Sequence, residues 1–453
     1  MHNWINWQIT CQVLDNRGLI MSISRRDFIK YTSVAALGTG VLGCHHEMNV
    51  SKSAGIMMPK SGKRIVVLGG GWGGATAAKY IKQEDPSIDV VIVEREDNFI
   101  SCHVSNWVIG GFKTMKDITI SYDALIKNYG IKVVHAEAKE LDAEKKQLKT
   151  DKGILEYDLI LVSPGISYRY ETIAGLNSAE AIKRFPAAMK AGPETVMIAE
   201  RLAAMKSGGS VLVAVPPTPY RCPPGPYERV SLIANYLKKN KPGSKLFVFD
   251  SNDDVVSKGK LFKAAWKDYY SDIIEYVPDN YIKSVDVGTG KVVSEKGEIT
   301  PDVANIIPAM KANQTAFDLG LMSKEKDLWV RAEPYTFESY KYKDVYVVGD
   351  ATHNGAVGGV PKSGYVANSM AKVAASAMAR KLNGQEPLVP TYVNTCYSLV
   401  NEDEGIFVSA VYKYDEASKR IKKISGGVSP TMNALFGRHA QDWATSIWSD
   451  MLL

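Results

Sequence analysis

Cysteine is scarce in this sequence, with only five in 453 residues. Cys11, Cys44, Cys102, Cys222 and Cys396 form no Cys-x-x-Cys pair and no zinc-ligand spacing, which argues against a disulfide scaffold or a structural metal site. After residue 50, no apolar run approaches the roughly 20 residues that a membrane-spanning helix needs. The net charge of +6 is small and spread along the chain, so it gives no indication of nucleic-acid binding.

The N-terminal segment, residues 1–44, predicts export. Arg25 and Arg26 precede a short stretch rich in Ala and Gly, which is the pattern of a twin-arginine signal. Such signals usually begin just before the arginine pair, so Met21 is a candidate for the true start. The sequence Val-Leu-Gly before Cys44 resembles a lipoprotein cleavage site, and lipidation there stays an open alternative. We therefore expect a periplasmic protein, with the polar residues 45–61 as a linker.

A dinucleotide site is predicted directly after this linker. The apolar run 64–68 is typical of a buried parallel strand, and it leads into a Gly-x-Gly-x-x-Gly loop followed by a helical segment. In such a loop Gly69 allows the tight turn, Gly71 lets the backbone approach a pyrophosphate, and Gly74 lets helix and strand pack closely. A second strand ends at Glu94, whose carboxylate is placed to accept hydrogen bonds from ribose hydroxyls.

Two later segments favour FAD over NAD as the bound dinucleotide. Residues 157–165 form a strand pattern that ends in Pro-Gly, and residues 345–351 form another that ends in Gly-Asp. Both resemble the paired signatures of flavoproteins with two dinucleotide-binding domains. The resemblance implies that the carboxylate of Asp350 approaches the ribityl chain of FAD.

A second Rossmann-like unit is predicted from the strand pattern 210–214. The loop that follows, residues 216–226, is rich in proline where a nucleotide-binding unit carries glycine. Proline removes backbone N–H donors, so this loop is unsuited to a pyrophosphate. NAD(P)H is therefore not the expected electron partner.

The specific motifs of the chain resemble those of the flavocytochrome c sulfide dehydrogenase flavoproteins, from about residue 63 to the C-terminus. These motifs are the glycine loop and helix after residue 68 and the segments 222–228, 361–368 and 394–398. The resemblance implies a periplasmic FAD enzyme that oxidises sulfide, or a related small inorganic sulfur compound, and passes electrons to a c-type cytochrome subunit.

The same resemblance assigns roles to individual residues. Cys102 matches the cysteine that forms a thioether to the flavin 8α carbon, and Trp443 matches an aromatic residue beside the isoalloxazine ring. Cys222 matches one half of a redox-active disulfide, and Glu228 matches an acidic residue that manages protons there. Cys222 and Glu228 are therefore the predicted catalytic residues.

One position departs from the expected pattern. The resemblance places the second disulfide cysteine directly after Gly-Asp-Ala, where this chain has Thr352. Cys396 matches a separate cysteine, so it is not an obvious substitute for the missing one. His353 beside the gap, and Arg221 beside Cys222, are candidates for polarising the thiol. Alternatives therefore remain open: oxidation of another sulfur species, quinone reduction, or a non-catalytic flavoprotein electron carrier.

The predicted fold class is α/β, with two Rossmann-like domains and a small C-terminal α+β domain. An FAD-binding domain is expected over residues 62–174 and 300–385, and the second Rossmann-like domain over residues 175–299. Residues 386–453 are expected to cover the flavin and to dock the cytochrome. Charged residues are frequent in this last segment, which argues against the apolar helix pair that a quinone-reducing enzyme would need.

Overall fold

The structure, a computed structural model, describes residues 12–14, 20–22, 55–353 and 359–453. The chain divides into two units, residues 1–53 and 54–453. In the first unit, β1 (Gln12–Leu14) and β2 (Ile20–Ser22) pair antiparallel. The predicted twin-arginine pair, Arg25 and Arg26, and the lipidation candidate Cys44 lie outside the described residues.

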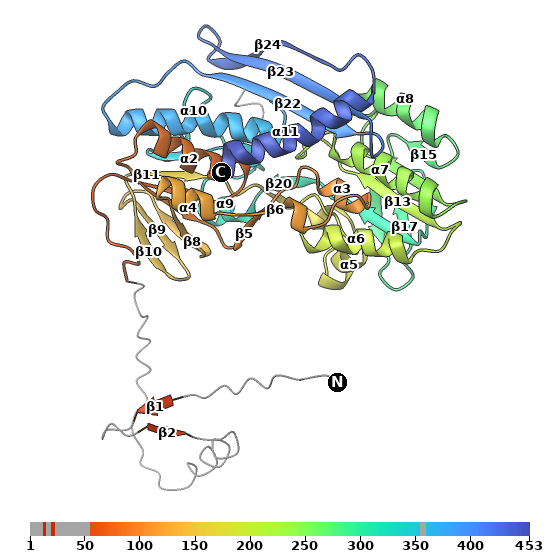
Figure 1. Cartoon of the computed structure of the whole chain (residues 1–453), viewed down its shortest axis with the longest axis horizontal. Helices are drawn as coiled ribbons and strands as arrows, with labels where there is room; N and C mark the ends of the chain where they lie inside the picture. The colour runs from red at the N-terminus through yellow and green to blue at the C-terminus, as the bar shows by residue number, and fades with distance from the viewer. Residues whose placement is uncertain (1–11, 15–19, 23–54, 354–358) are drawn as a thin grey trace, which may run out of the picture. The chain divides into compact units, whose positions relative to one another are not determined.

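The second unit contains a five-stranded parallel sheet in the order β21-β11-β3-β4-β7 (Figure 1). Its central strand β3 is an unbroken run of five buried residues, as expected where both faces of a sheet are covered. The edge strand β21 comes from much later in the chain than its neighbour β11. The sheet consists of β3 (Arg64–Leu68), β4 (Asp89–Val93), β7 (Lys132–Val134), β11 (Leu159–Val162) and β21 (Val345–Val347).

Helices α2 (Trp72–Glu84) and α10 (Gly364–Leu382) pack against each other beside this sheet. Small residues dominate the buried face of α10, including six buried alanines. They allow the two helices to approach closely, and α10 then carries the chain from β21 toward the C-terminal strands.

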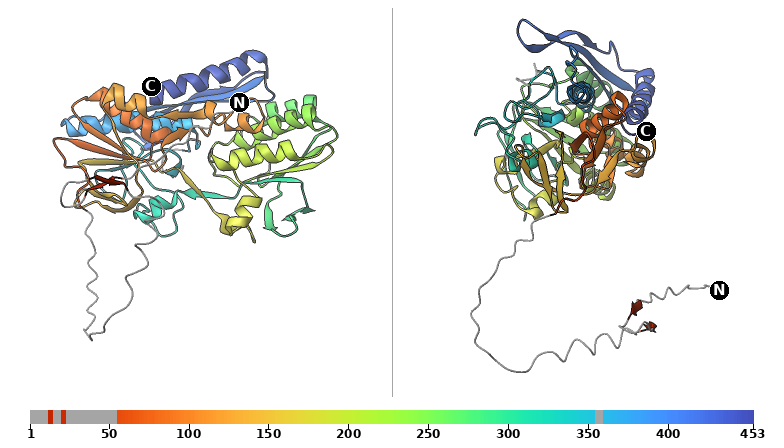
Figure 2. Two further views of the ribbon diagram at one scale, coloured as in Figure 1. Left: turned by 60° about the horizontal axis from the view of Figure 1, so that its bottom comes forward. Right: turned by 90° about the vertical axis from the view of Figure 1, so that its left-hand side faces the viewer.

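A second parallel sheet has the order β15-β14-β13-β19, and Figure 2 shows it apart from the first. Its strands are β13 (Ser210–Val215), β14 (Lys245–Asp250), β15 (Ile274–Val277) and β19 (Val303–Ile306). The helices α7 (Gly225–Asn240) and α8 (Gly259–Tyr270) pack against each other beside it.

The C-terminal part forms an antiparallel sheet of β22 (Thr391–Leu399), β23 (Gly405–Asp415) and β24 (Arg420–Val428). The long helix α11 (Ala434–Leu452) packs on β22 and β23 and also contacts α2. Strand β22 contacts both α10 and α7, so it bridges the two parallel sheets. The predicted fold class is confirmed; the exact domain boundaries stay predictions.

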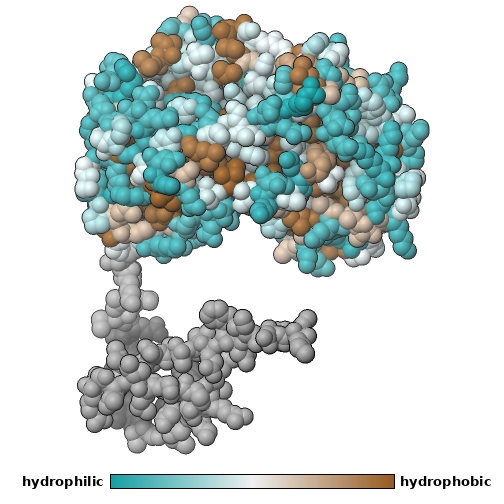
Figure 3. All heavy atoms as spheres, in the orientation of Figure 1, coloured by the Kyte–Doolittle hydropathy of each residue, from teal (hydrophilic) through white to brown (hydrophobic). Residues whose placement is uncertain are grey.

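Shorter elements complete the unit. They are strands β5 (Asn98–Ile100), β6 (Thr119–Ser121), β8 (Ala138–Asp142), β9 (Gln147–Thr150), β10 (Gly153–Glu156), β12 (Ile166–Tyr168), β16 (Ile282–Val285), β17 (Val292–Ser294), β18 (Gly297–Ile299) and β20 (Met310–Ala312), and helices α3 (Ser105–Ile109), α4 (Asp123–Tyr129), α5 (Ala179–Arg184), α6 (Pro193–Ala204) and α9 (Gln314–Asp318). On the face shown in Figure 3, hydrophilic residues surround several apolar patches. Among the described residues, no helix has the length and apolarity to cross a membrane.

Candidate functional site

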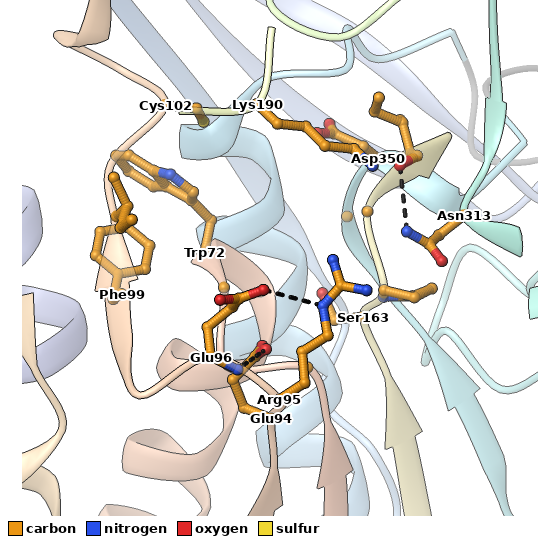
Figure 4. Close-up of a pocket in the computed structure, with 18 of the residues that line it drawn as sticks. Trp72, Glu94, Arg95, Glu96, Phe99, Cys102, Ser163, Lys190, Asn313 and Asp350 are labelled. Carbon is orange, nitrogen blue, oxygen red and sulfur yellow. Dashed lines mark hydrogen bonds and ion pairs between the residues drawn. The ribbon is translucent and has the colours of Figure 1, made fainter. Parts of the chain in front are cut away.

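A cavity of about 650 Å³ lies at the carboxyl ends of the first sheet's strands and is here called the dinucleotide cavity. Its lining includes Gly69 after β3, Glu94 after β4, Ser163 after β11 and Asp350 after β21. Ligands of open α/β sheets bind at this edge, where successive strand ends face one crevice. Glu94, Cys102 and Asp350 all line this cavity, and Figure 4 shows Glu94 apart from Cys102 and Asp350.

The glycine loop has the geometry that a pyrophosphate needs. Gly69 has a φ of +98°, a left-handed conformation that favours glycine. A Cβ on Gly74 would lie 1.7 Å from the carbonyl oxygen of Gly69, so only glycine fits at the start of α2. No side chain caps the N-terminus of α2, and no acidic residue lies in its first turn. Its backbone N–H groups are therefore available to an anion.

Glu94 holds the glycine loop in place. Its Oε2 accepts a hydrogen bond of 2.7 Å from the backbone N–H of Gly70, and its Oε1 accepts one of 3.0 Å from Glu96. The carboxylate lines the dinucleotide cavity, so a ribose would meet it with acceptor capacity remaining.

Asp350 lies at the other end of the cavity and is 9% exposed. Its Oδ2 forms an ion pair of 3.2 Å with Nε of Arg221. Its Oδ1 is buried and has no hydrogen-bond partner among the described residues. A buried carboxylate oxygen without a donor is costly, and its residue lines a cavity of dinucleotide size. A ligand hydroxyl would satisfy it, so the residues present fit FAD.

Cys102 lines two cavities at once: the dinucleotide cavity and a much smaller neighbour. Its Sγ lies 2.8 Å from Nη2 of Arg221 and 3.7 Å from Nδ1 of His103. Burial alone would raise the pKa of this thiol, but the Arg221 charge and the His103 contact together lower it to about 7. At neutral pH a large fraction of Cys102 is therefore the nucleophilic thiolate.

The smaller space, about 20 Å³, is here called the cysteine cavity. It brings together residues from α3, α7, β22, α11 and their flanking loops, and its lining residues are Cys102, His103, Val104, Asn106, Trp107, Cys222, Glu228, Cys396, Tyr397, Ser398, Ala440 and Trp443. All three described thiols, Cys102, Cys222 and Cys396, are free in the structure. A volume of this size holds about one water-sized molecule.

Cys396 is the residue that sequence analysis missed. The sequence did not make it an obvious substitute for the missing second cysteine, yet β22 places it in the same cavity as Cys222. Thr352, the position that was expected to face Cys222, does not line this cavity. Its hydroxyl donates a hydrogen bond of 2.8 Å to the carbonyl oxygen of Gly349 instead.

The proline loop orients Arg221 and Cys222 in different directions. Arg221 lines the dinucleotide cavity, whereas Cys222 lines the cysteine cavity. Cys222 has a φ of +55°, an uncommon conformation for a residue with a side chain. Its backbone N–H donates a hydrogen bond of 2.6 Å to the carbonyl oxygen of Lys362. The polarising partner predicted for Cys222, Arg221, makes its direct thiol contact with Cys102.

Cys222 and Cys396, which both line the cysteine cavity, differ in acidity. Burial raises the pKa of Cys222, and the neighbouring Cys396 and Cys102 charges raise it further. Burial also acts to raise the pKa of Cys396, but the Lys258 charge and His103 outweigh it and lower that pKa overall. Cys396 is therefore the better leaving thiolate of the two.

Glu228 lines the cysteine cavity as predicted and is 7% exposed. Its Oε1 accepts hydrogen bonds of 3.1 Å from Nε1 of Trp107 and 2.9 Å from the backbone N–H of Leu399. Its Oε2 accepts one of 2.9 Å from Asn106. Three donors thus fix the carboxylate beside the thiols.

His103 was also missed by sequence analysis, whereas His353 does not line the cysteine cavity. The His103 ring lies 4.5 Å from the Trp72 ring and 5.4 Å from the Trp443 ring. Burial disfavours its charged form, but the Cys102 and Cys396 thiolates outweigh burial and raise the pKa of His103 to about 10. His103 therefore supplies a positive charge among the thiols.

Trp443 reaches the cysteine cavity from α11. Its ring stacks with Trp72 at 6.2 Å and 20°, and with Tyr365 at 6.2 Å and 22°. Trp443 also lines an outer cavity of about 420 Å³ with Tyr365 and His439. The predicted aromatic residue thus lies between the thiols and the surface.

Three family models match the chain. "Sulfide dehydrogenase (flavocytochrome c) flavoprotein chain, central" matches residues 195–308, and "Flavocytochrome c sulphide dehydrogenase, flavin-binding" matches residues 389–452. "Pyridine nucleotide-disulphide oxidoreductase" matches residues 63–215.

Known relatives agree with these matches. The chain is 54% identical over 46 residues to the sulfide dehydrogenase (flavocytochrome c) flavoprotein chain of Chlorobaculum thiosulfatiphilum, which covers 10% of this chain and 96% of that one. It is 24% identical over 314 residues to the mitochondrial sulfide:quinone oxidoreductase of Mus musculus, covering 65% of this chain and 66% of that one. The solved sulfide:quinone oxidoreductase of Aquifex aeolicus shares the fold, with a TM-score of 0.70 at 16% identity, over 86% of this chain and 91% of that one.

Proposed function

Since the chain belongs to the family of flavocytochrome c sulfide dehydrogenase flavoproteins, we propose that it is an exported FAD enzyme that oxidises sulfide and passes the electrons to a c-type cytochrome. One observation carries this proposal: Cys102 lies on the wall shared by a dinucleotide-sized cavity and a cavity lined by Cys222 and Cys396. The arrangement places three thiols, which can react with a sulfur substrate, beside the proposed flavin site.

The dinucleotide cavity provides groups that would hold the pyrophosphate, the adenosine ribose and the ribityl chain of FAD. The N-terminus of α2 and its glycine loop would hold the pyrophosphate, and Glu94 the adenosine ribose. Asp350, with its unpartnered Oδ1, would hold the ribityl chain. When bound, FAD supplies a two-electron acceptor for reduced sulfur.

We also propose that Cys102 carries the flavin as a thioether. Its Sγ lies in the cavity wall and is half-ionised near pH 7, so the chain presents a nucleophile where the resemblance places the bond. Arg221 holds the thiolate and the Asp350 carboxylate at once. A covalent bond would retain the cofactor after export.

The size of the cysteine cavity selects the substrate. A space of about 20 Å³ admits a single small species such as hydrosulfide and excludes an organic thiol. We propose that Cys222 and Cys396 form the redox pair. Because the lower pKa belongs to Cys396, hydrosulfide attacks the sulfur of Cys222, and Cys396 leaves as the thiolate. Glu228 is fixed beside both thiols to hold a proton.

Export by the twin-arginine route and a cytochrome partner follow from the signal pattern and from the family, and both are part of the proposal. The alternative of a non-catalytic electron carrier was raised by Thr352. It loses support because Cys396 provides the second thiol beside Cys222.

Anaerobic stopped-flow mixing with sulfide tests this function. We expect the wild-type flavin to bleach with sulfide, and the Cys222→Ala and Cys396→Ala variants to bleach with dithionite only. Thr352→Ala is the matched control and should bleach with sulfide normally, because Thr352 lies outside the cysteine cavity. A wild-type flavin that sulfide leaves oxidised would refute the proposal.

A further inference from the structure

Lys258 is a buried lysine that the proposed chemistry has not yet used. It is 6% exposed and lies at the N-cap of α8, with a φ of +57°. Among the described residues, no carboxylate lies within ion-pairing distance of its ammonium group. The ammonium donates two hydrogen bonds and lies over the ring of Phe262. A buried ammonium without a counterion is strongly unfavourable, and so is a left-handed residue with a side chain. Both features point to a function.

The contacts of Lys258 lead to the cysteine cavity. Its Nζ donates hydrogen bonds of 3.2 Å to the carbonyl oxygen of Cys396 and 2.8 Å to Oγ of Ser398. Both of those residues line the cysteine cavity. Burial lowers the pKa of Lys258, and the negative charges of Cys396, Glu228 and Cys222 oppose this effect by favouring the ammonium form. The missing counterion is therefore an anion that forms in or beside this cavity.

Ser398 can extend the effect of Lys258 into the cavity. Because its Oγ accepts from the ammonium, its hydroxyl hydrogen points elsewhere, and it makes no other hydrogen bond with residues 55–353 or 359–453. A hydroxyl polarised by an ammonium is a good donor to an anion. The cavity therefore contains a donor that is unused in the absence of such an anion.

We propose that Lys258 is a positioning residue that, together with Ser398, stabilises the anionic sulfur formed on Cys396. The inference rests on the proposed function. In the step concerned, hydrosulfide bonds to the Cys222 sulfur and the Cys222–Cys396 bond breaks. The electron pair of that bond goes to Cys396, and the proton stays on the terminal sulfur of the Cys222 persulfide. The sulfide sulfur is oxidised, the disulfide is its oxidant, and one negative charge moves next to Lys258.

Other charged groups face the same thiol from neighbouring elements. His103, which precedes α3, favours the Cys396 thiolate, whereas Glu228 from α7 opposes it. Cys222 and Cys102 line the same cavity and add negative charge when ionised. The Lys258 charge is the first of the causes that lower the pKa of Cys396, and a hydrogen bond and a charge from His103 add to it.

Replacing Lys258 with Met keeps the length of the side chain and removes its charge. In the flavin-loaded, thiol-reduced protein, the ultraviolet absorbance of the Cys396 thiolate is titrated against pH, after subtraction of the matching Cys396→Ser protein. We expect the Lys258→Met midpoint to rise by at least about one pKa unit, which is a tenfold loss of thiolate at a given pH below the midpoint. The exposed Lys267 on the same helix gives the control Lys267→Met, for which we expect no shift.

The measurement separates this inference from the proposed function, because it uses no sulfide. An unchanged midpoint in Lys258→Met overturns the role of Lys258, even if sulfide reduces the wild-type flavin. A flavin that sulfide does not reduce refutes the function, whatever the midpoint. If Lys258→Met does not fold, Ser398→Ala decides: it removes one hydroxyl, should raise the midpoint by a smaller amount, and overturns the inference if the midpoint stays.

Discussion

The contact between Arg221 and Cys102 predicts a measurable thiol reactivity. In the structure, the surroundings of Cys102 lower its pKa from the ordinary thiol value of 9.0 to about 7. Two units correspond to about 2.7 kcal/mol and raise the thiolate fraction at pH 7 from about 1% to about one half. The Arg221 charge is the first of the causes that lower this pKa, and a hydrogen bond and a charge from His103 add to it. Arg221→Met should therefore raise the pKa of Cys102 by about one unit or more and slow its alkylation at pH 7 by about fivefold or more.

The assay uses protein prepared without flavin, so that the Cys102 thiol is free. Iodoacetamide enters through the dinucleotide cavity, and mass spectrometry of the Cys102 peptide gives the rate at each pH. The wild-type rate should fall as the pH drops below about 7, because the reactive thiolate becomes protonated. In Arg221→Met the same fall should begin at a higher pH.

Arg331→Met is the matched control, because Arg331 pairs with Asp327 and lines neither cavity. Its Cys102 rate should equal the wild-type rate. In flavin-loaded wild type, Cys102 should not react, because its sulfur is engaged in the thioether. Equal Cys102 rates in the flavin-free wild type and Arg221→Met would refute the electrostatic argument.

Further predictions concern electrons, cofactor, export and nucleotide preference. In a dithionite titration, the oxidised wild type should take up about four electrons per FAD, two for the flavin and two for the disulfide, and the Cys396→Ser variant should take up about two. Equal uptake by the two proteins would exclude a Cys222–Cys396 disulfide. Acid-precipitated wild type should stay yellow while Cys102→Ser releases its flavin, and free flavin in the wild-type supernatant would contradict a covalent bond. Replacing Arg25 and Arg26 with Lys should trap the precursor in the cytoplasm, as measured by cell fractionation. Normal export of this variant would contradict the twin-arginine signal. Anaerobic NADH should not bleach the flavin, because proline residues occupy the loop 216–226; rapid bleaching would overturn that reading.

The dinucleotide site could be predicted from the sequence because its determinants are local. Gly69 and Gly74 shape the turn within one strand-turn-helix unit. The proline residues of the loop 216–226 show directly that it has few backbone N–H donors. Asp350 was predictable because a Gly-Asp pair directly follows a buried strand. Each of these residues has a role that its immediate neighbours in the chain reveal.

The cysteine cavity could not be predicted in the same way. Cys396, His103 and Lys258 come from three elements that are far apart in sequence, and they meet only because β22 lies across the start of α7. The contact of Arg221 with Cys102, and not with its neighbour Cys222, could not be predicted from the sequence either. Two adjacent residues of one loop line different cavities, and Cys222 has a left-handed backbone conformation that its sequence does not reveal.

Strand β21 belongs to the first sheet but lies late in the sequence, and this position has a consequence for biosynthesis. Strand β21 pairs with β11, yet residues 163–344 separate them, and they include the whole of the second sheet. Contacts of such long range form slowly, because a large loop must close first. Asp350 lies directly after β21, so a ribosome must finish most of this chain before the ribityl end of the cavity exists. The cavity is thus completed late in synthesis, and a nascent chain stalled before residue 345 would have the glycine loop without the Asp350 carboxylate that completes the site.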